Sequence, residues 1–111
     1  MSDHDCLFCK IINKEIPSGF SYEDDSFVVF KDINPKAPVH LLIVPKKHIR
    51  SINDLTFEHR DIIADIFEVA KKMAINNNVD KSGYKLFFNV EKGGGQEIFH
   101  IHLHLIGGWK K

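Results

Sequence analysis

The sequence predicts an α+β fold in which an antiparallel sheet packs against helices on one side. Several short runs are rich in β-branched and aromatic residues, whereas only one segment is long and periodic enough for a long helix. The elements follow in the order short helix, two or three strands, long helix, two strands. A parallel sheet would need a crossover helix between each pair of strands, and the chain has too few helical segments for that.

The first elements are a short helix and a hairpin. Apolar side chains at four-residue spacing predict a helix from Leu7 to Ile16, which ends before Pro17 and Gly19. Tyr22 and the run 27–30 favour strands, and the acidic residues between them favour the turn of a hairpin.

A proline-rich loop, a strand and the long helix come next. Two prolines in residues 34–38 predict an ordered loop, and an apolar strand follows from His40 to Val44. The long helix runs from Thr56 to about Asn77, and Thr56 can cap its start. Its predicted core stripe comprises Ile62, Ile63, Ile66, Phe67, Ala70, Met73 and Ala74.

The last two strands include the most informative segment of the chain. A strand from Tyr84 to Val90 is followed by a tight glycine loop at 93–95 and by a strand from His100 to Ile106. Histidine occupies every second position at the start of that last strand. We therefore expect its three histidines on one face of the sheet and the aliphatic side chains between them on the other.

Length, composition and charge narrow the function classes. A chain of 111 residues, 43% of them hydrophobic, fits one domain over residues 1–111 with its own core. Fifteen basic and fifteen acidic residues cancel, so we expect neither nucleic acid nor a membrane surface as a partner. The sequence has no run of about 18 apolar residues and no leader pattern, which predicts a soluble cytoplasmic protein.

The three strand histidines indicate nucleophilic chemistry rather than a metal centre built on one strand. His100 and His104 start about 13 Å apart along an extended chain. The two rings therefore cannot easily bind the same zinc ion with zinc–nitrogen bonds of about 2.0–2.1 Å. Neutral imidazole, whose reference pKa is about 6.5, can attack, accept a proton or donate one at neutral pH. The alternative is a sheet face that is merely polar and solvated.

Two other motifs carry weaker signals. Cys6 and Cys9 form a C-x-x-C pair, which fits a metal site, a redox pair or simply two small apolar residues. A zinc site would need two more ligands, from His4, His40, His48, His59 or the strand histidines. The glycines at 93–95 can offer backbone N–H groups to a phosphate, but no Lys-Ser or Lys-Thr follows them as in a P-loop.

The last strand and the loop before it resemble the signature of the histidine-triad family, and other segments resemble its Hint branch in the same order. The triad motif is His100 to Ile106, preceded by Gly94-Gly95-Gln96. The further matching segments are 8–17 (FCKIINKEIP), 23–25 (EDD), 32–40 (DINPKAPVH), 45–48 (PKKH) and 107–108 (GG). The resemblance covers nearly the whole chain.

The resemblance implies a fold and a reaction. It implies an antiparallel five-stranded sheet that continues across a homodimer, with a purine nucleoside monophosphate site in each subunit. It implies hydrolysis of purine nucleoside phosphoramidates and acyl-nucleotides, with no cofactor in the chemistry. By position His102 is the nucleophile that becomes nucleotidylated, His104 and His40 assist it, and Glu97 protonates the leaving amine. The alternative for Glu97 is an exposed loop residue without a role.

The resemblance also implies the nucleotide-binding residues. Asp32 is expected to bind the ribose hydroxyls, although an ordinary acidic turn residue is the alternative. The phosphate side is expected to comprise Asn89, Gly95, Gln96, Glu97, His102 and His104. The purine wall is expected to comprise Leu7, Phe8, Ile11, Ile16, Phe30 and Ile33, residues that a hydrophobic core would equally contain.

Some branches of the family hold a structural zinc ion, and all of its ligand positions are occupied in this sequence. They are Cys6, Cys9, His48 and His100. Two thiolates and two imidazoles form a closed tetrahedral set, which implies stability rather than catalysis. Such a site would remove His100 from the reaction.

Several functional alternatives stay open at this point. One is dinucleoside polyphosphate hydrolysis, as in another branch of the same superfamily. A second is a nucleotide-binding regulatory or scaffold protein with vestigial activity, and a third is a metal-dependent hydrolase. The sequence ends at Trp109-Lys110-Lys111, where many relatives continue with a tail that shapes leaving-group specificity, so the resemblance does not carry their substrate preference over.

Overall fold

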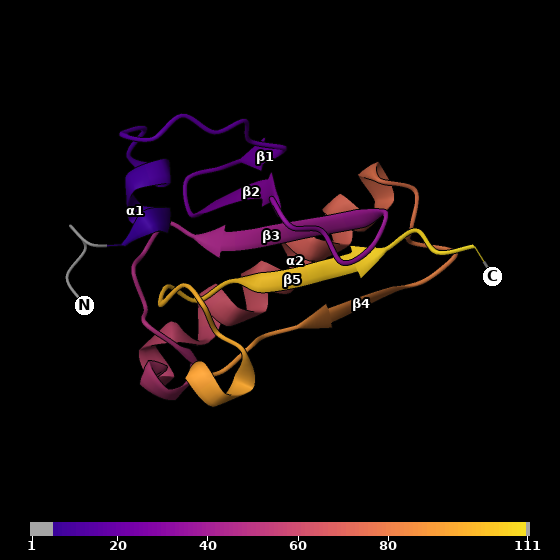
Figure 1. Cartoon of the computed structure of the whole chain (residues 1–111). Helices are drawn as coiled ribbons and strands as arrows, with labels where there is room; N and C mark the ends of the chain where they lie inside the picture. Colours follow the sequence, from indigo (N-terminus) through magenta and orange to yellow (C-terminus); the bar gives the residue numbers. More distant parts are fainter. Residues whose placement is uncertain (1–5, 111) are drawn as a thin grey trace.

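The computed structural model describes residues 6–110, whose strands form one antiparallel sheet (Figure 1). With η marking 3₁₀ turns, the elements are α1 (Leu7–Ile12), β1 (Tyr22–Glu23), β2 (Phe27–Lys31), β3 (Val39–Pro45), η2 (Ile52–Asp54), η3 (Phe57–His59), α2 (Arg60–Asn76), β4 (Tyr84–Phe87), η4 (Lys92–Gly94) and β5 (Leu103–Gly107). The strand order is β1-β2-β3-β5-β4, and every neighbouring pair is antiparallel. The predicted α+β class and five-stranded sheet are confirmed.

The two helices cover opposite faces of the sheet, so the expectation that both lie on one side is wrong. Alternate residues of β2 show this directly, since Phe27 and Val29 pack with α2 whereas Val28 and Phe30 pack with α1. The central strands are therefore apolar at consecutive positions, which is typical of strands buried on both faces. The α1-side cluster comprises Cys6, Phe8, Cys9, Ile11, Val28, Phe30, Leu42 and Val44.

Helix α2 supplies most of the core on its side of the sheet. Its buried residues are Ile66, Val69, Ala70, Met73 and Ala74. Phe67, which the sequence places in the stripe, is 38% exposed. The N–H of Thr56 donates to Nδ1 of His59 at 3.0 Å and starts the turn η3, so the regular helix begins later than predicted, at Arg60. No helix within residues 6–110 has both the length and the hydrophobicity of a membrane span.

Helix α1 is shorter than predicted, because it ends at Ile12 rather than at Ile16. Lys14 adopts a left-handed backbone conformation, with φ of 63°, which stops the helix. The N–H groups of Glu15 and Ile16 then turn back to the carbonyl of Lys10. Ile16 still packs against the α1-side cluster, so the apolar spacing in this segment reflects burial beyond the end of the helix.

The strand that carries the histidines is also shorter, because β5 begins at Leu103 rather than at His100. Leu103 and Leu105 lie in the core beside α2, as the alternation predicts, while the last two histidines lie on the other face. The neighbouring strand β4 ends at Phe87 rather than at Val90. His100 and His102 therefore both precede the paired part of the strand.

Replacing Ile66 by alanine should lower the free energy of unfolding by about 2–5 kcal/mol, since its side chain is fully buried between α2 and the sheet. Ile75 on the same helix is 58% exposed. Ile75→Ala should therefore cost about 0.5 kcal/mol or less. Urea denaturation of the two variants measures the difference, and equal losses would contradict this assignment of the buried face of α2.

Candidate active site

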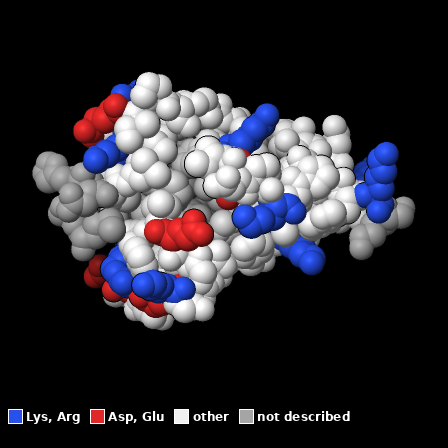
Figure 2. Space-filling model, in the orientation of Figure 1, with Lys and Arg blue, Asp and Glu red and all other residues white. Residues whose placement is uncertain are grey.

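A cavity of about 590 Å³ lies on the face of the sheet that carries α1. Its walls come from α1, from β2 and the loop that follows it, from β3 and β4, from Gly95, Glu97 and Ile98, and from the last two histidines. On the face of the molecule shown in Figure 2, basic and acidic side chains are interspersed. That face therefore carries no continuous field of one sign.

Most residues that the sequence proposes for catalysis or nucleotide binding line this cavity. They are Leu7, Phe8, Ile11, Phe30, Asp32, Ile33, His40, Asn89, Gly95, Glu97, His102 and His104. Ile16 and Gln96 do not belong to the wall. Ile16 packs against the α1-side cluster, and the Gln96 side chain is buried within the glycine loop.

The cavity also contains residues that the sequence analysis missed. They are Ser18, Lys31, Asn34, Lys36, Leu42, Phe87 and Ile98. Leu42 could have been found from its strand, because it follows His40 by two positions and so shares its face. Phe87 could not, because it reaches the site through the register that pairs it with His104 of β5.

Aromatic contacts hold the rings of His102 and His104 in place. The centroids of these two rings are 4.9 Å apart, and each residue is 8% exposed. Phe87 stacks on His104 at 4.6 Å with the ring planes within 5° of parallel. Phe8 contacts His102 edge-on at 5.0 Å. Rings packed in this way keep fixed orientations, as groups that act on a bound substrate require.

A main-chain carbonyl determines which nitrogen of His102 is available. Nδ1 of His102 lies 2.7 Å from the carbonyl oxygen of His100. Because a carbonyl can only accept, Nδ1 is the donor, and the lone pair of the neutral ring is on Nε2. Burial lowers the pKa of His102, which favours the neutral ring at neutral pH. His102 therefore offers a nucleophilic nitrogen in the wall of the cavity.

His40 and His104 form a second pair of neutral imidazoles beside it. Nε2 of His40 is 3.0 Å from Nδ1 of His104 and 3.4 Å from Oδ2 of Asp32. Burial lowers the pKa of His40 although Asp32 opposes the change. Burial, together with the neighbouring histidines, lowers the pKa of His104 to about 4. The imidazoles in the cavity wall are therefore uncharged near pH 7.

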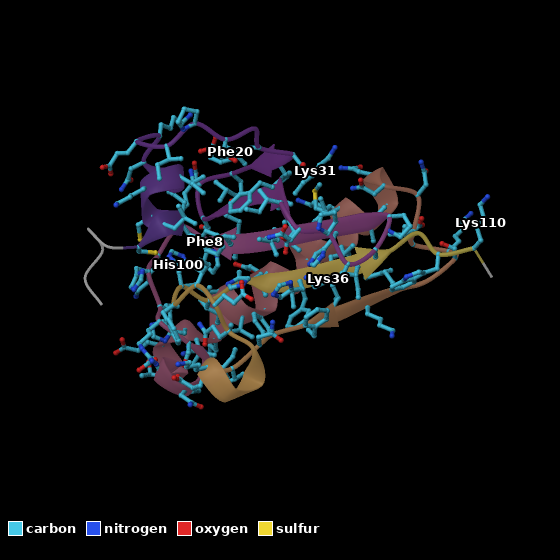
Figure 3. All side chains as sticks on the ribbon, in the orientation of Figure 1. Phe8, Phe20, Lys31, Lys36, His100 and Lys110 are labelled. Carbon is cyan, nitrogen blue, oxygen red and sulfur yellow. The ribbon has the colours of Figure 1, made fainter. Side chains whose placement is uncertain are left out.

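His100 also contacts residues on the α1 side of the sheet, including Phe8, but its imidazole belongs to a separate cluster with Cys6 and Cys9 rather than to the cavity wall. In Figure 3 it lies with Phe8 at the α1 end of the sheet, and the two ring centroids are 5.9 Å apart. Its Nδ1 is 3.3 Å from Sγ of Cys6, 3.5 Å from Sγ of Cys9 and 3.2 Å from Nδ1 of His48.

These four side chains fit one tetrahedral metal ion. Their ligand atoms all lie within 4.8 Å of one another. An ion bound at about 2.3 Å by sulfur and about 2.0 Å by nitrogen separates its ligands by about 3.3–3.8 Å, close to the distances of His100 and His48 from the cysteines and from each other. Nε2 of His100 donates to the carbonyl of Pro45 at 2.7 Å, which leaves the Nδ1 lone pair for a metal.

The glycine loop is closed by its own hydrogen bonds. The N–H groups of Gly94 and Gln96 donate to the carbonyl of Glu91, and that of Gly95 donates to the carbonyl of Lys92. The sequence predicts that the N–H groups of the glycines at 93–95 face a phosphate, but those of Gly94 and Gly95 are used within the loop. Gly95 nevertheless lies at the cavity wall, together with the side chain of Asn89.

A polar clamp holds this loop to the segment that follows His48. Gln96 accepts the N–H of Glu91 at 2.8 Å and donates to the carbonyls of Arg50 and Ile98 at 2.8 and 3.1 Å. Glu91 has φ of 62° and ψ of 172°, a conformation that residues with a Cβ atom rarely adopt. Its carboxylate accepts from Ser51 and Arg50, each at 2.6 Å, and these bonds hold the strained backbone in place.

Comparison with known proteins gives concordant matches along the chain. A family model described as scavenger mRNA decapping enzyme C-terminal binding matches residues 5–110. The purine nucleoside phosphoramidase of Escherichia coli (strain K12) is 44% identical over 102 residues, which cover 92% of this chain and 86% of the relative. A HIT family hydrolase from Legionella pneumophila Philadelphia 1 has a TM-score of 0.93 at 51% identity, covering 96% of this chain and 95% of that one. A histidine triad protein from Clostridium difficile has a TM-score of 0.94 at 44% identity, covering 100% and 96%.

The position of Gln96 gives a test that separates a structural role from contact with a ligand. Gln96→Ala should lower the free energy of unfolding by about 1–3 kcal/mol, because buried backbone groups lose their partners. The neighbouring variant Glu97→Ala should leave stability nearly unchanged, since Glu97 is exposed. Chemical denaturation measures both. Wild-type stability in Gln96→Ala, combined with weaker nucleotide binding, would show that the side chain contacts the ligand instead.

Proposed function

The chain belongs to the histidine-triad (HIT) family as a Hint-like protein and is a hydrolase, and from this premise we propose that it hydrolyses purine nucleoside phosphoramidates and acyl-nucleotides. The products are a nucleoside monophosphate and the released amine or acid. The observation that carries the proposal is the buried neutral ring of His102, which lines the cavity while its Nδ1 is held by the carbonyl of His100. The Escherichia coli relative named purine nucleoside phosphoramidase supports the same substrate class.

The cavity suits a purine nucleotide in this proposal. A flat base requires an apolar slot, and the apolar wall comprises Leu7, Phe8, Ile11, Phe30, Ile33, Leu42 and Ile98. Asp32 is partly exposed at the wall and accepts ribose hydroxyls. Asn89 and Gly95, which contact each other at the cavity wall, bind the phosphate together with His102 and His104 in this proposal.

The first chemical step transfers the nucleotide to the protein. Nε2 of His102 attacks the α-phosphorus, and the bond from phosphorus to the leaving nitrogen breaks. His104 binds a phosphoryl oxygen, and His40 positions His104. Glu97, at the cavity wall, gives the leaving amine its proton. In the second step water attacks phosphorus and returns a proton to Glu97, the bond to His102 breaks and the nucleoside monophosphate leaves, so the cycle needs no cofactor.

We also propose that zinc occupies the cluster of Cys6, Cys9, His48 and His100 as a structural ion. A metal bound by four protein groups has no open position for substrate, so its contribution is to cross-link α1 to the segments after β3 and before β5. Two thiolate ligands need a reducing compartment, which supports a cytoplasmic location.

We further propose that two copies of the chain form a homodimer through β4 and α2. β4 is an outer strand of the sheet, and an outer strand offers unpaired backbone groups to another chain. Partly exposed apolar side chains lie on the same elements or next to them, namely Ile63, Phe67, Leu86 and Phe88. Two of them contact each other, since the ring centroids of Phe67 and Phe88 are 6.3 Å apart.

Trapping the covalent intermediate tests the proposed nucleophile. After mixing with adenosine phosphoramidate and quenching in base, intact mass spectrometry should show one added nucleotide, and peptide mapping should place it on His102. His102→Ala should lose turnover by roughly a thousandfold or more while nucleoside monophosphate binding persists. His59→Ala is the matched control, because His59 lies outside the cavity wall. Full turnover in His102→Ala would contradict the mechanism.

The substrate class is tested by rates on two compounds. Turnover of adenosine phosphoramidate should exceed that of a diadenosine polyphosphate. Faster cleavage of the polyphosphate would indicate that the chain is a dinucleoside polyphosphate hydrolase. Nucleotide binding without turnover of either compound would indicate a regulatory protein instead.

Metal removal should affect stability before it affects catalysis. Metal analysis should find one zinc ion per chain, and a strong chelator should lower Tm because α1 loses its cross-link. Cys9→Ser should have a low Tm that the chelator does not lower further. The reaction rate, measured well below both Tm values, should persist through chelation, and its immediate loss would place a metal in the reaction.

A further inference from the structure

The loop before β3 contains a main-chain donor aimed at one of the site histidines. The N–H of Lys36 lies 3.0 Å from Nδ1 of His40, four residues further along the chain. A backbone N–H can only donate, so Nδ1 of His40 accepts and carries no proton. In the neutral ring the proton is then on Nε2.

The tautomer of His40 in turn determines the tautomer of His104. Nε2 of His40 lies 3.0 Å from Nδ1 of His104. The carboxylate oxygen of Asp32 is more distant, at 3.4 Å, beyond the usual range for a direct hydrogen bond. Because Nε2 of His40 is the donor, Nδ1 of His104 is the acceptor, and the proton of neutral His104 is on its Nε2. Burial lowers the pKa of both residues and favours these neutral rings.

The last nitrogen of this chain of bonds has no hydrogen-bond partner within the described part of the protein. Nε2 of His104 is buried, and His104 lines the cavity. A buried N–H without an acceptor costs free energy, so its place in the wall points to an acceptor supplied by a ligand.

We propose that the main-chain N–H of Lys36 is a positioning group that sets the tautomers of His40 and His104, so that His104 presents Nε2–H to an oxygen of the bound substrate. The tautomers follow from the protein alone, whereas the identity of the acceptor as a phosphoryl oxygen rests on the proposed function. His102 has the opposite tautomer, with Nδ1–H held by a carbonyl and the lone pair on Nε2. The cavity therefore places one nucleophilic nitrogen beside one N–H donor.

The contact between the N–H of Lys36 and Nδ1 of His40 also disfavours a metal ion among Asp32, His40 and His104. Asp32, His40 and His104 have ligand atoms within 4.8 Å of one another, a spacing that a divalent ion could use. An ion on Nε2 of His40 would need the lone pair of that nitrogen, which moves the proton to Nδ1. Nδ1–H would then face the N–H of Lys36, and two donors would oppose each other. The cluster therefore carries a hydrogen-bond relay.

Nitrogen NMR of the wild-type protein tests the proposal directly. Long-range ¹H–¹⁵N spectra near pH 7 distinguish a protonated from an unprotonated ring nitrogen. His40 and His104 should both show the Nε2–H tautomer, while His102 should show Nδ1–H and serves as the internal control. Signals are assigned by single His→Gln variants. A proton on Nδ1 of His40 or of His104 would overturn the proposal, whether or not the protein cleaves a phosphoramidate.

Two substitutions at one position isolate the N–H from the side chain. Lys36→Ala keeps the N–H and should keep all three tautomers, whereas Lys36→Pro removes it and should give His40 a mixture of tautomers. Turnover of adenosine phosphoramidate should be lower in Lys36→Pro than in Lys36→Ala by roughly tenfold or more, mainly in kcat, because the donor on His104 is lost in part of the molecules. Equal tautomers and equal kcat in both variants would overturn the proposal. If Lys36→Pro does not fold, the wild-type and Lys36→Ala spectra decide.

A metal titration adds an independent readout. Zinc added to the Cys9→Ser variant should leave the ring signals of His40 and His104 unshifted at one equivalent. A stoichiometric shift of both signals would establish a metal site there and overturn the relay.

Discussion

The antiparallel register between β3 and β5 is the constraint on which the site depends. It pairs His40 with Ile106 and Leu42 with His104, so the two histidines are diagonal neighbours on one face although they are 64 residues apart in sequence. A slip of one residue would turn His104 into the core beside α2 and bring Leu105 out to the cavity. The aliphatic residues on the other face fix the register, so packing of the core determines the geometry of the site.

Helix α1 links the cavity to the cluster of Cys6, Cys9, His48 and His100. Cys6 and Cys9 turn towards His48 and His100, Phe8 contacts the ring of His102, and the neighbouring Ile11 is part of the apolar wall. A helix of six residues is not stable in isolation, so its position depends on these contacts. Any ion that binds the two cysteines would therefore also steady the aromatic ring that packs on His102.

Local periodicity predicts part of this structure well. The alternation in β5 separates His102 and His104 from the aliphatic side chains, because a period of two residues is a property of the strand itself. The separate cluster of His100 depends on groups such as His48, 52 residues away, and the clamp at Gln96 depends on Arg50, 46 residues away. Contacts of this kind leave no local pattern. The same holds for the placement of α1 on the face opposite α2, whereas most of the residues that the family resemblance proposes for the site line one cavity.

The two atoms that orient the site histidines, the carbonyl of His100 and the N–H of Lys36, both belong to the main chain. A side-chain substitution leaves such atoms in place, so an alanine scan would record position 36 as tolerant. Natural sequences could vary there for the same reason, with proline as the one residue that the contact forbids. Sequence conservation and mutational scanning therefore do not detect main-chain groups of this type. Their role is apparent only from the hydrogen bonds of the folded protein.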